Sequence, residues 1–306
     1  MGGISVKGKT KRQINWPILF IAPFFLTYII FNLFPMIFSF YISLTEWGGF
    51  GPMKFIGPAN YKIVWSDPSF FRSIWNSICI VFMGMIPMQL VGLILALLLN
   101  YGFIKFGQSY VRNAFFMPYV TAPVAIGLIF AAVFDENFGV VNAALQALGL
   151  IQENIDWLHT ASLAKPLVAF VSTWRYAGYI MLIYLSGLQA IPRELYEAAN
   201  VDGAKPFTAM RKIILPMLKP TIVFQVTLGI IGCMRTFEEP LMLFGQGKNY
   251  NGGMNNAAQT MNMKFLQVAF QSGQSGYGAA IGYSMFVIIL AFTIIYFRLV
   301  SKKEEE

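Results

Sequence analysis

The stretch that decides the fold reads "YEAANVDGAKPFTAMRKIILP" and spans residues 196–216. It is polar and charged, yet it lies between two long hydrophobic segments, residues 166–189 and 221–244. About 25% of the residues in a typical soluble domain are charged, whereas this 306-residue chain is 12% charged and 57% hydrophobic. The composition therefore indicates a membrane protein, in which the quoted stretch would be a loop outside the bilayer.

Long runs without charged residues locate the membrane spans. Four runs contain no charged side chain: residues 13–45, 73–104, 113–134 and 265–297. Each is long enough, because about 20 apolar residues cross the hydrocarbon core of a bilayer. Two further runs are interrupted only by Arg175 and by the group Arg235, Glu238 and Glu239. We therefore expect an all-α polytopic protein with six transmembrane helices, at about residues 17–44, 74–100, 114–134, 166–189, 217–243 and 279–299.

Prolines inside these helices predict kinks. Each proline removes one backbone hydrogen bond, which neighbouring helices must replace in a membrane. The prolines concerned include Pro23, Pro35, Pro87, Pro118 and Pro123.

The distribution of Lys and Arg predicts the orientation of the chain. Cytoplasmic segments of membrane proteins retain these residues, and here they are most frequent near both termini and in the loop that contains residues 196–216. We therefore expect a cytoplasmic tail at residues 1–16, a transmembrane domain at 17–299 and a cytoplasmic tail at 300–306. The net charge of +8 then reflects topology, because a DNA-binding face would need a basic soluble surface.

The cytoplasmic loop, residues 190–220, is predicted to contain a short helix. Pro192 suits the first turn of a helix, and Gly203 can adopt the left-handed conformation that ends one. The adjacent Ala198 and Ala199 would keep one helix face flat, so that the groove of another protein can approach the backbone. Glu197 would offer an acceptor to a basic partner. The alternative is an ordinary solvated loop, which composition alone favours.

The spacing within this loop favours a docking function. Glu197-Ala198-Ala199, three residues, Gly203, nine residues, Ile213, one residue and then Leu215-Pro216 resembles the EAA loop of ATP-binding-cassette (ABC) importer permeases. The stretches at 55–77, 111–134 and 172–204 look like the sugar-importer branch of that family, of the maltose and glycerol-phosphate permease type.

The resemblance implies a fold, a mechanism and a set of partners. It implies the type I ABC importer permease fold, in which the loop helix sits in a cleft on an ATPase subunit and transmits its motion. The coupling residues would then be Glu197, Ala198, Ala199, Gly203, Ile213, Leu215 and Pro216. The chain would be half of a pathway for a carbohydrate, with oligosaccharides favoured, in a bacterial cytoplasmic (inner) membrane.

The implied partners supply what this chain lacks. They are a second permease subunit, with which the chain would form a heterodimer, two copies of an ABC ATPase and an extracellular or periplasmic sugar-binding protein. The chain has no Gly-rich phosphate loop ending in Gly-Lys-Ser/Thr. We therefore expect no enzyme activity and no cofactor in this chain, with ATP and Mg used by the ATPase subunit.

One loop departs from the family pattern. After the fifth helix these permeases commonly have Gly-Gly-Pro, whereas this chain has Gly252-Gly253-Met254. Because the loop is predicted to face the outer compartment, the change concerns the docking of the binding protein and the substrate rather than the fold.

Charged and aromatic residues inside the helices are candidates for the substrate pathway. Intramembrane charges are costly and usually face the bundle interior or a cavity. Hydrogen-bonding groups can bind sugar hydroxyls, and aromatic rings can cover the apolar face of a sugar. The candidates are Trp174, Arg175, Tyr176, Arg235, Glu238 and Glu239, followed by the amides Gln89 and Gln225.

Each candidate has a structural alternative. Arg235 is three and four residues from Glu238 and Glu239, so that an intrahelical ion pair serving stability is equally compatible with the sequence. Lone amides such as Gln89 and Gln225 often join helices to each other by hydrogen bonds.

Two other classes of protein fit the sequence less well. An ion-coupled secondary transporter acting without an ATPase would have a carboxylate near the membrane midplane, but Glu238 and Glu239 are predicted near the outer surface. An intramembrane enzyme ranks last, because the single histidine, His159, is predicted in an outer loop with no metal-ligating companion at a usable spacing. We therefore expect neither a catalytic nor a metal site.

Overall fold

The computed structural model describes residues 16–101, 107–245 and 250–301. Within these ranges the regular structure is almost entirely helical, apart from a small antiparallel ribbon of β1 (Thr45–Glu46) and β2 (Lys54–Phe55). Five helical segments of the described chain are long and apolar enough to cross a membrane, and a bent pair of helices makes six if it counts as one span. The predicted all-α polytopic fold is confirmed. The predicted tails, 1–16 and 300–306, lie almost entirely outside the described residues.

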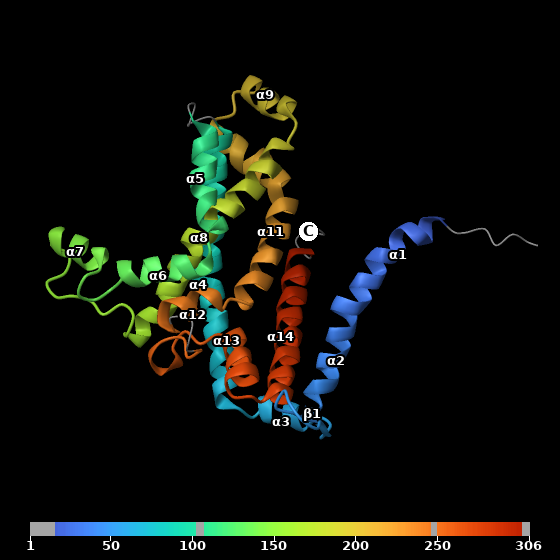
Figure 1. The fold of residues 1–306 in the computed structure, drawn as a ribbon. Helices are drawn as coiled ribbons and strands as arrows, with labels where there is room; N and C mark the ends of the chain where they lie inside the picture. The colour runs from blue at the N-terminus through green and yellow to red at the C-terminus, as the bar shows by residue number, and fades with distance from the viewer. Residues whose placement is uncertain (1–15, 102–106, 246–249, 302–306) are drawn as a thin grey trace, which may run out of the picture.

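Two long helices form the centre of the bundle. They are α4 (Pro68–Asn100) and α8 (Ala161–Gln189), which lie side by side (Figure 1). Gly92 of α4 allows this close packing, because a Cβ there would lie 2.6 Å from a side-chain atom of Ile180 on α8. Small residues at such contacts let membrane helices approach each other.

The third span is bent rather than straight. It consists of α5 (Gln108–Val120) and α6 (Pro123–Val133), whose axes differ by 96°. The residue before a proline is disfavoured in the helical conformation, and Ala122 before Pro123 is indeed non-helical with ψ 131°. The expected single helix at 114–134 was therefore wrong in its shape. The bend directs α6 away from the bundle axis and toward α12 (Glu238–Gly245) (Figure 1).

The first and fifth spans each contain a wide helical turn next to a proline. The first runs through α1 (Trp16–Tyr28), the π-turn η1 (Ile29–Leu33) and α2 (Phe34–Ser43). The fifth runs through α10 (Pro206–Ala209), the π-turn η2 (Met210–Ile214) and α11 (Leu215–Met234). Because a proline ring clashes with the carbonyl four residues earlier, a wider turn before Pro35 and Pro216 relieves the clash.

The fifth span extends to Gly245, but its helix is interrupted within the expected range. The sequence predicts one helix at 217–243, whereas α11 stops at Met234 and α12 begins at Glu238. This break separates Arg235 from Glu238 and Glu239, so the three residues do not share one continuous helix.

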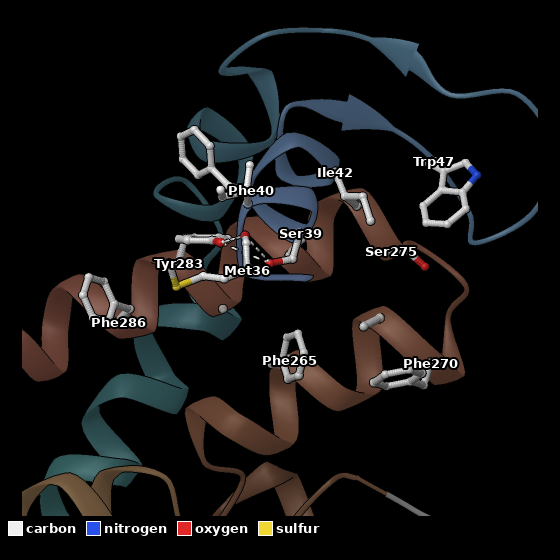
Figure 2. A pocket seen from close by; sticks show the side chains of 14 residues that line it. Met36, Ser39, Phe40, Ile42, Trp47, Phe265, Phe270, Ser275, Tyr283 and Phe286 are labelled. Carbon is white, nitrogen blue, oxygen red and sulfur yellow. Dashed lines mark hydrogen bonds between the residues drawn. The ribbon is translucent and has the colours of Figure 1, made fainter. Parts of the chain in front are cut away.

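The first span leans away from the other helices. In Figure 1, α1 diverges from the bundle, whereas α2 contacts α14 (Ser275–Ser301). The contact includes a hydrogen bond from the Tyr283 hydroxyl to the Met36 carbonyl and a 3.1 Å hydrogen bond between Ser39 and Tyr283. Figure 2 shows the apolar cavity of about 750 Å³ beside this contact, with Phe265 and Phe270 on its other side.

Short elements complete the chain between the spans. They are α3 (Ala59–Val64), α7 (Val140–Ala147), α9 (Arg193–Val201), the 3-10 turn η3 (Met254–Asn256), α13 (Met261–Leu266) and the π-turn η4 (Gln267–Gln271). The loop around α7 is held by Asn142, whose amide donates to the carbonyls of Glu136 and Ile155 and accepts from the Trp157 indole at 2.9 Å. In Figure 1, α9 lies at one end of the bundle, whereas α3 and α13 lie toward the other end.

Candidate functional site

The loop helix predicted between Ala190 and Pro220 is present as α9. It ends in a glycine cap: Gly203 has φ +69°, the Ala204 amide donates to the Ala199 carbonyl at 2.9 Å, and the Asp202 amide donates to the Ala198 carbonyl at 2.9 Å. This arrangement satisfies carbonyls at the end of the helix and favours glycine at the left-handed position. The local helix and its stop signal were therefore predicted correctly.

The two faces of α9 have different surroundings. Glu197 and Ala198 are exposed, whereas Ala199 is buried. Leu195 and Tyr196 pack against the apolar cluster that contains Leu188 and Ile191. The helix is therefore anchored to the bundle by one face, and of the two adjacent alanines only Ala198 is open to a partner.

The remaining loop residues lie where the loop enters the fifth span. Ile213, within η2, and Leu215, the first residue of α11, are half-buried. Pro216 is exposed next to them. The non-helical residues 202–205 separate α9 from α10, and from α10 onward the helix continues through η2 into α11.

A charged cluster joins α8 to α12 inside the bundle. The Arg175 Nη1 group donates to Glu238 Oε2 at 2.8 Å and to Glu239 Oε1 at 2.7 Å. The side chains of Arg175 and Glu239 are 8% and 6% exposed, and that of Glu238 is 37% exposed. The first turn of α12 suits carboxylates, because the amino end of a helix favours negative charge. We refer to Arg175, Glu238 and Glu239 as the charged cluster.

The intrahelical pairing of Arg235 with Glu238 or Glu239 was wrong. The helix is broken between them, and both carboxylates bind Arg175, which lies 63 and 64 residues away in the sequence. Arg235 is exposed and lines a separate, mostly apolar cavity with Met285 and Ile289 of α14.

A second polar feature is a pocket of about 290 Å³ between α4, α5, α8 and α11. We call it the α8–α11 pocket. Its lining residues are Met88, Tyr119, Ser172, Tyr176, Tyr179, Ile180, Gln225, Leu228, Gly229, Gly232, Cys233 and Thr236. The rings of Tyr119 and Tyr179 stack in its wall with their centroids 4.5 Å apart.

Two buried oxygen atoms in this pocket lack hydrogen-bond partners within the described chain. They are the Ser172 hydroxyl oxygen and Gln225 Oε1, on residues that are 5% and 2% exposed. Leaving a buried polar atom unpaired costs about 1–3 kcal/mol. The residues that carry these oxygens line the pocket, but each oxygen is itself covered by neighbouring atoms, so a polar ligand would pair with it only after the surrounding side chains move.

The structure separates the predicted pathway residues. Tyr176 and Gln225 line the α8–α11 pocket. Trp174 lies half exposed against Phe130, with the ring centroids 5.1 Å apart, and does not line this pocket. Gln89 accepts from the Tyr184 hydroxyl and donates to the Gln225 carbonyl at 3.5 Å, in agreement with the alternative that it joins helices.

Sequence reasoning missed several residues of the pocket. Ser172, Tyr119, Tyr179 and Thr236 were not candidates. One signal was available, because Ser172, Tyr176 and Tyr179 recur at helical spacing and so share one face of α8.

The described residues contain no group of three or more side chains that could hold a metal ion. His159 is 73% exposed and pairs with Asp156 at 2.9 Å, as expected for a surface residue.

The altered Gly-Gly-Met loop is held against α4. Gly252 and Gly253 have φ +64° and +86°, and a Cβ on Gly252 would lie 2.3 Å from the Gln259 amide nitrogen. Asn76 of α4 donates to the carbonyls of Asn256 and Gln259 at 2.9 and 3.1 Å. Met254 is exposed, so the residue in the family's proline position does not contribute to the core.

Comparison with known proteins gives consistent results. Residues 64–305 match the family described as binding-protein-dependent transport system inner membrane component. The arabinooligosaccharides transport system permease protein AraP of Bacillus subtilis (strain 168) is 34% identical over 92% of this chain and 88% of its own length. The lactose transport system permease protein LacF of Rhizobium radiobacter is 34% identical over 91% of this chain and 92% of its own.

The fold has a counterpart among solved structures. A chain from the crystal structure of a bacterial ABC transporter for the acidic polysaccharide alginate superimposes with a TM-score of 0.81, at 21% identity, over 94% of this chain and 96% of that one. These matches confirm the resemblance drawn from the EAA loop, and the chain therefore belongs to the family of binding-protein-dependent transport system inner membrane components, the permease subunits of ABC transporters.

Proposed function

We propose that this chain forms half of the translocation pathway of an ATP-driven importer for a carbohydrate, an oligosaccharide rather than a single sugar. The names of its relatives support a saccharide, since they include permeases for arabinooligosaccharides, lactose and diacetylchitobiose. The observation that carries the proposal is the α8–α11 pocket. It combines unpaired oxygens on Ser172 and Gln225 with tyrosine rings, the combination that binds the hydroxyls and the apolar face of a sugar.

The proposal assigns energy coupling to the loop helix. Glu197, Ala198 and Gly203 form an open surface at the end of the bundle, which suits docking to a separate ATPase subunit that uses ATP and Mg. Ile213, Leu215 and Pro216 would pass the motion to α11. In this arrangement residues 17–299 form the permease domain and both termini are cytoplasmic.

The complete transporter would contain several further proteins. They are a second permease subunit, two copies of the ATPase and an extracellular or periplasmic sugar-binding protein, in the cytoplasmic membrane of a bacterium. A counterpart of this chain has been solved as an alginate ABC transporter in complex with a pentasaccharide-bound periplasmic protein, which supports a binding protein as one partner.

Reconstitution of the complete transporter in lipid vesicles tests the proposal. We expect an oligosaccharide, presented with the binding protein, to stimulate ATP hydrolysis and to accumulate in the vesicles only when ATP is supplied. Sugar uptake by this chain alone in ATP-free vesicles driven by an ion gradient would overturn the proposal and favour a secondary transporter.

The coupling role is tested by Gly203→Asp in the same transporter. A Cβ at this position meets no atom within 4 Å, and Asp and Asn both tolerate a positive φ better than other side chains. We therefore expect the variant to insert in the membrane normally but to lose transport, because it adds a negative charge to the docking surface. Gly203→Asn is the matched control without the charge, and it should keep more activity. Normal uptake by Gly203→Asp would rule out the coupling role.

A further inference from the structure

We infer that the α8–α11 pocket selects a neutral sugar unit and rejects one that carries a carboxylate. The inference rests on the proposed function, in which this pocket is part of the sugar pathway. It narrows the substrate class from carbohydrates in general to neutral oligosaccharides, and it sets this chain apart from the alginate transporter whose fold it shares.

The lining of the pocket offers a carboxylate no positive charge. Its described polar residues are hydroxyl, thiol and amide side chains, and no Lys, Arg or His is among them. A buried carboxylate without a paired cation is strongly unfavourable. A uronate in this pocket would therefore depend on cations just beyond the lining.

The arginine nearest along α8 is already paired with two carboxylates, although its Nε group has no partner in the described chain. Arg175 precedes the lining residue Tyr176, and its guanidinium carbon lies 5.1 Å from the centroid of that ring. The guanidinium group donates to both Glu238 and Glu239. One formal positive charge thus faces two formal negative charges, so the charged cluster as a whole repels an anion.

The other intramembrane arginine belongs to a different surface. Arg235 lines the cavity formed with Met285 and Ile289, and none of the residues of that cavity lines the α8–α11 pocket. Its side chain therefore contributes no positive charge to the lining of the α8–α11 pocket.

The unpaired oxygen of Gln225 also favours a hydroxyl. Gln225 Oε1 is an acceptor that has no donor within the described chain. A sugar hydroxyl can donate a hydrogen bond to this atom, whereas an ionised carboxylate has only acceptors. A carboxylate opposite Gln225 Oε1 would therefore leave this acceptor unpaired, in addition to the repulsion by the charged cluster.

The test measures equilibrium binding to the complete transporter without its binding protein, so that the specificity of that protein does not enter. The neutral probes are the trisaccharides of arabinose, glucose, galactose and N-acetylglucosamine, and the charged probe is trigalacturonate. We expect at least one neutral trisaccharide to bind about tenfold or more tightly than trigalacturonate.

A charge variant tests the cause of this selectivity. Glu238→Gln removes one negative charge and keeps the Arg175–Glu239 pair, so the affinity for trigalacturonate relative to the neutral sugar should rise about threefold or more. The matched control is Glu136→Gln, an exposed residue in the loop before α7, which should leave this ratio unchanged. An unchanged ratio in Glu238→Gln would contradict the role of the charged cluster.

The outcomes for the inference and for the proposed function are distinct. Trigalacturonate that binds as tightly as every neutral probe would overturn the inference and leave the carbohydrate importer standing. If no saccharide of either class binds, and none stimulates ATP hydrolysis when it is presented with the binding protein, the proposed function itself fails, and the inference fails with it.

Discussion

The charged cluster and the α8–α11 pocket lie within one helical turn of each other on α8, but their polar atoms are in opposite situations. Arg175 bridges two carboxylates at 2.8 and 2.7 Å. Ser172 and Gln225 carry buried oxygens with no partner in the described chain. Both features interrupt an apolar bundle, but the charges of the cluster are paired within the protein and only Arg175 Nε lacks a partner in the described chain, whereas both pocket oxygens lack one.

This difference distinguishes a structural polar group from a ligand site. A charge inside a membrane protein is often taken as a part of the pathway, but a charge whose partners are already in place has little left to offer a substrate. A neutral side chain that is buried and unpaired can still form a hydrogen bond with a ligand. We therefore assign the charged cluster to stability and selectivity, and the pocket to binding.

The largest expected effect is on stability and follows from Arg175→Met. The substitution leaves two carboxylates without their cation, one of them almost fully buried, and breaking a buried ion pair in this way costs about 3–5 kcal/mol. We expect a large loss of folded protein and a lower melting temperature, measured on the purified transporter in detergent.

Two further variants make this result specific. The triple variant Arg175→Met, Glu238→Gln, Glu239→Gln removes all the charges together and should recover most of the stability. Arg235→Met is the control for the loss of an intramembrane arginine, and because Arg235 is exposed its effect should be within about 0.5 kcal/mol. Equal destabilisation by Arg175→Met and Arg235→Met would contradict the assignment of a structural role to the charged cluster.

The opposite pattern is expected for Gln225→Leu. Its Oε1 is unpaired, so the substitution removes a buried polar atom without breaking a hydrogen bond of that atom, and stability should stay the same or rise by about 1 kcal/mol. Transport should fall at least tenfold if this oxygen binds the sugar. Melting temperature and sugar-stimulated ATP hydrolysis, measured on the same preparation, separate the two effects.

Gln89→Leu provides the matched control for this variant. Gln89 accepts a hydrogen bond from Tyr184, whose hydroxyl would then be left without this acceptor inside the bundle. Its loss should lower stability by about 1–3 kcal/mol. If Gln225→Leu lowers stability and transport in parallel, as Gln89→Leu would, the pocket has a structural role and the assignment to binding is wrong.

Much of the fold could be predicted because its signals are local. Charge-free runs marked the spans, and Gly203 marked the end of α9, since each depends on residues close in sequence. The shape of the spans was harder to predict from the sequence. Pro118 and Pro123 both lie in the third span, but the 96° bend occurs only before Pro123, because tertiary packing decides which proline bends a helix.

The candidate site was harder to predict because its contacts are not local. The sequence placed Arg175 inside the membrane, but a spacing of three and four residues left Arg235 as an equally compatible partner of the carboxylates. The break after Met234 and the packing of α12 near α8 reversed that assignment. Ser172 was missed because a single serine in an apolar helix is unremarkable until its burial and its lack of a partner are known.

The smallest expected effect concerns a third polar group, Asp67, at the more exposed end of α4. Its carboxylate accepts from the Ser69 amide at 2.8 Å and the Tyr277 hydroxyl at 3.0 Å, and it lies 3.5 Å from Lys264. Burial raises the pKa of Asp67, but the hydrogen bonds from Ser69 and Tyr277 and the charge of Lys264 outweigh it, so the pKa lies below its ordinary value of 3.8.

A lowered pKa in the folded state stabilises the protein above pH 3.8, and the stabilisation is lost as the pH falls through the folded-state value. Asp67→Asn keeps a good helix cap but removes the charge, so we expect a loss of about 0.5–1 kcal/mol at pH 7. The difference in melting temperature between the wild type and this variant should shrink toward pH 3. Because Asp67 is partly exposed to water, its effect should also weaken in high salt, whereas the effect of Arg175→Met should not. If the stability loss caused by Asp67→Asn does not change with salt, then solvent exposure does not explain the difference between the Asp67–Lys264 pair and the buried charged cluster.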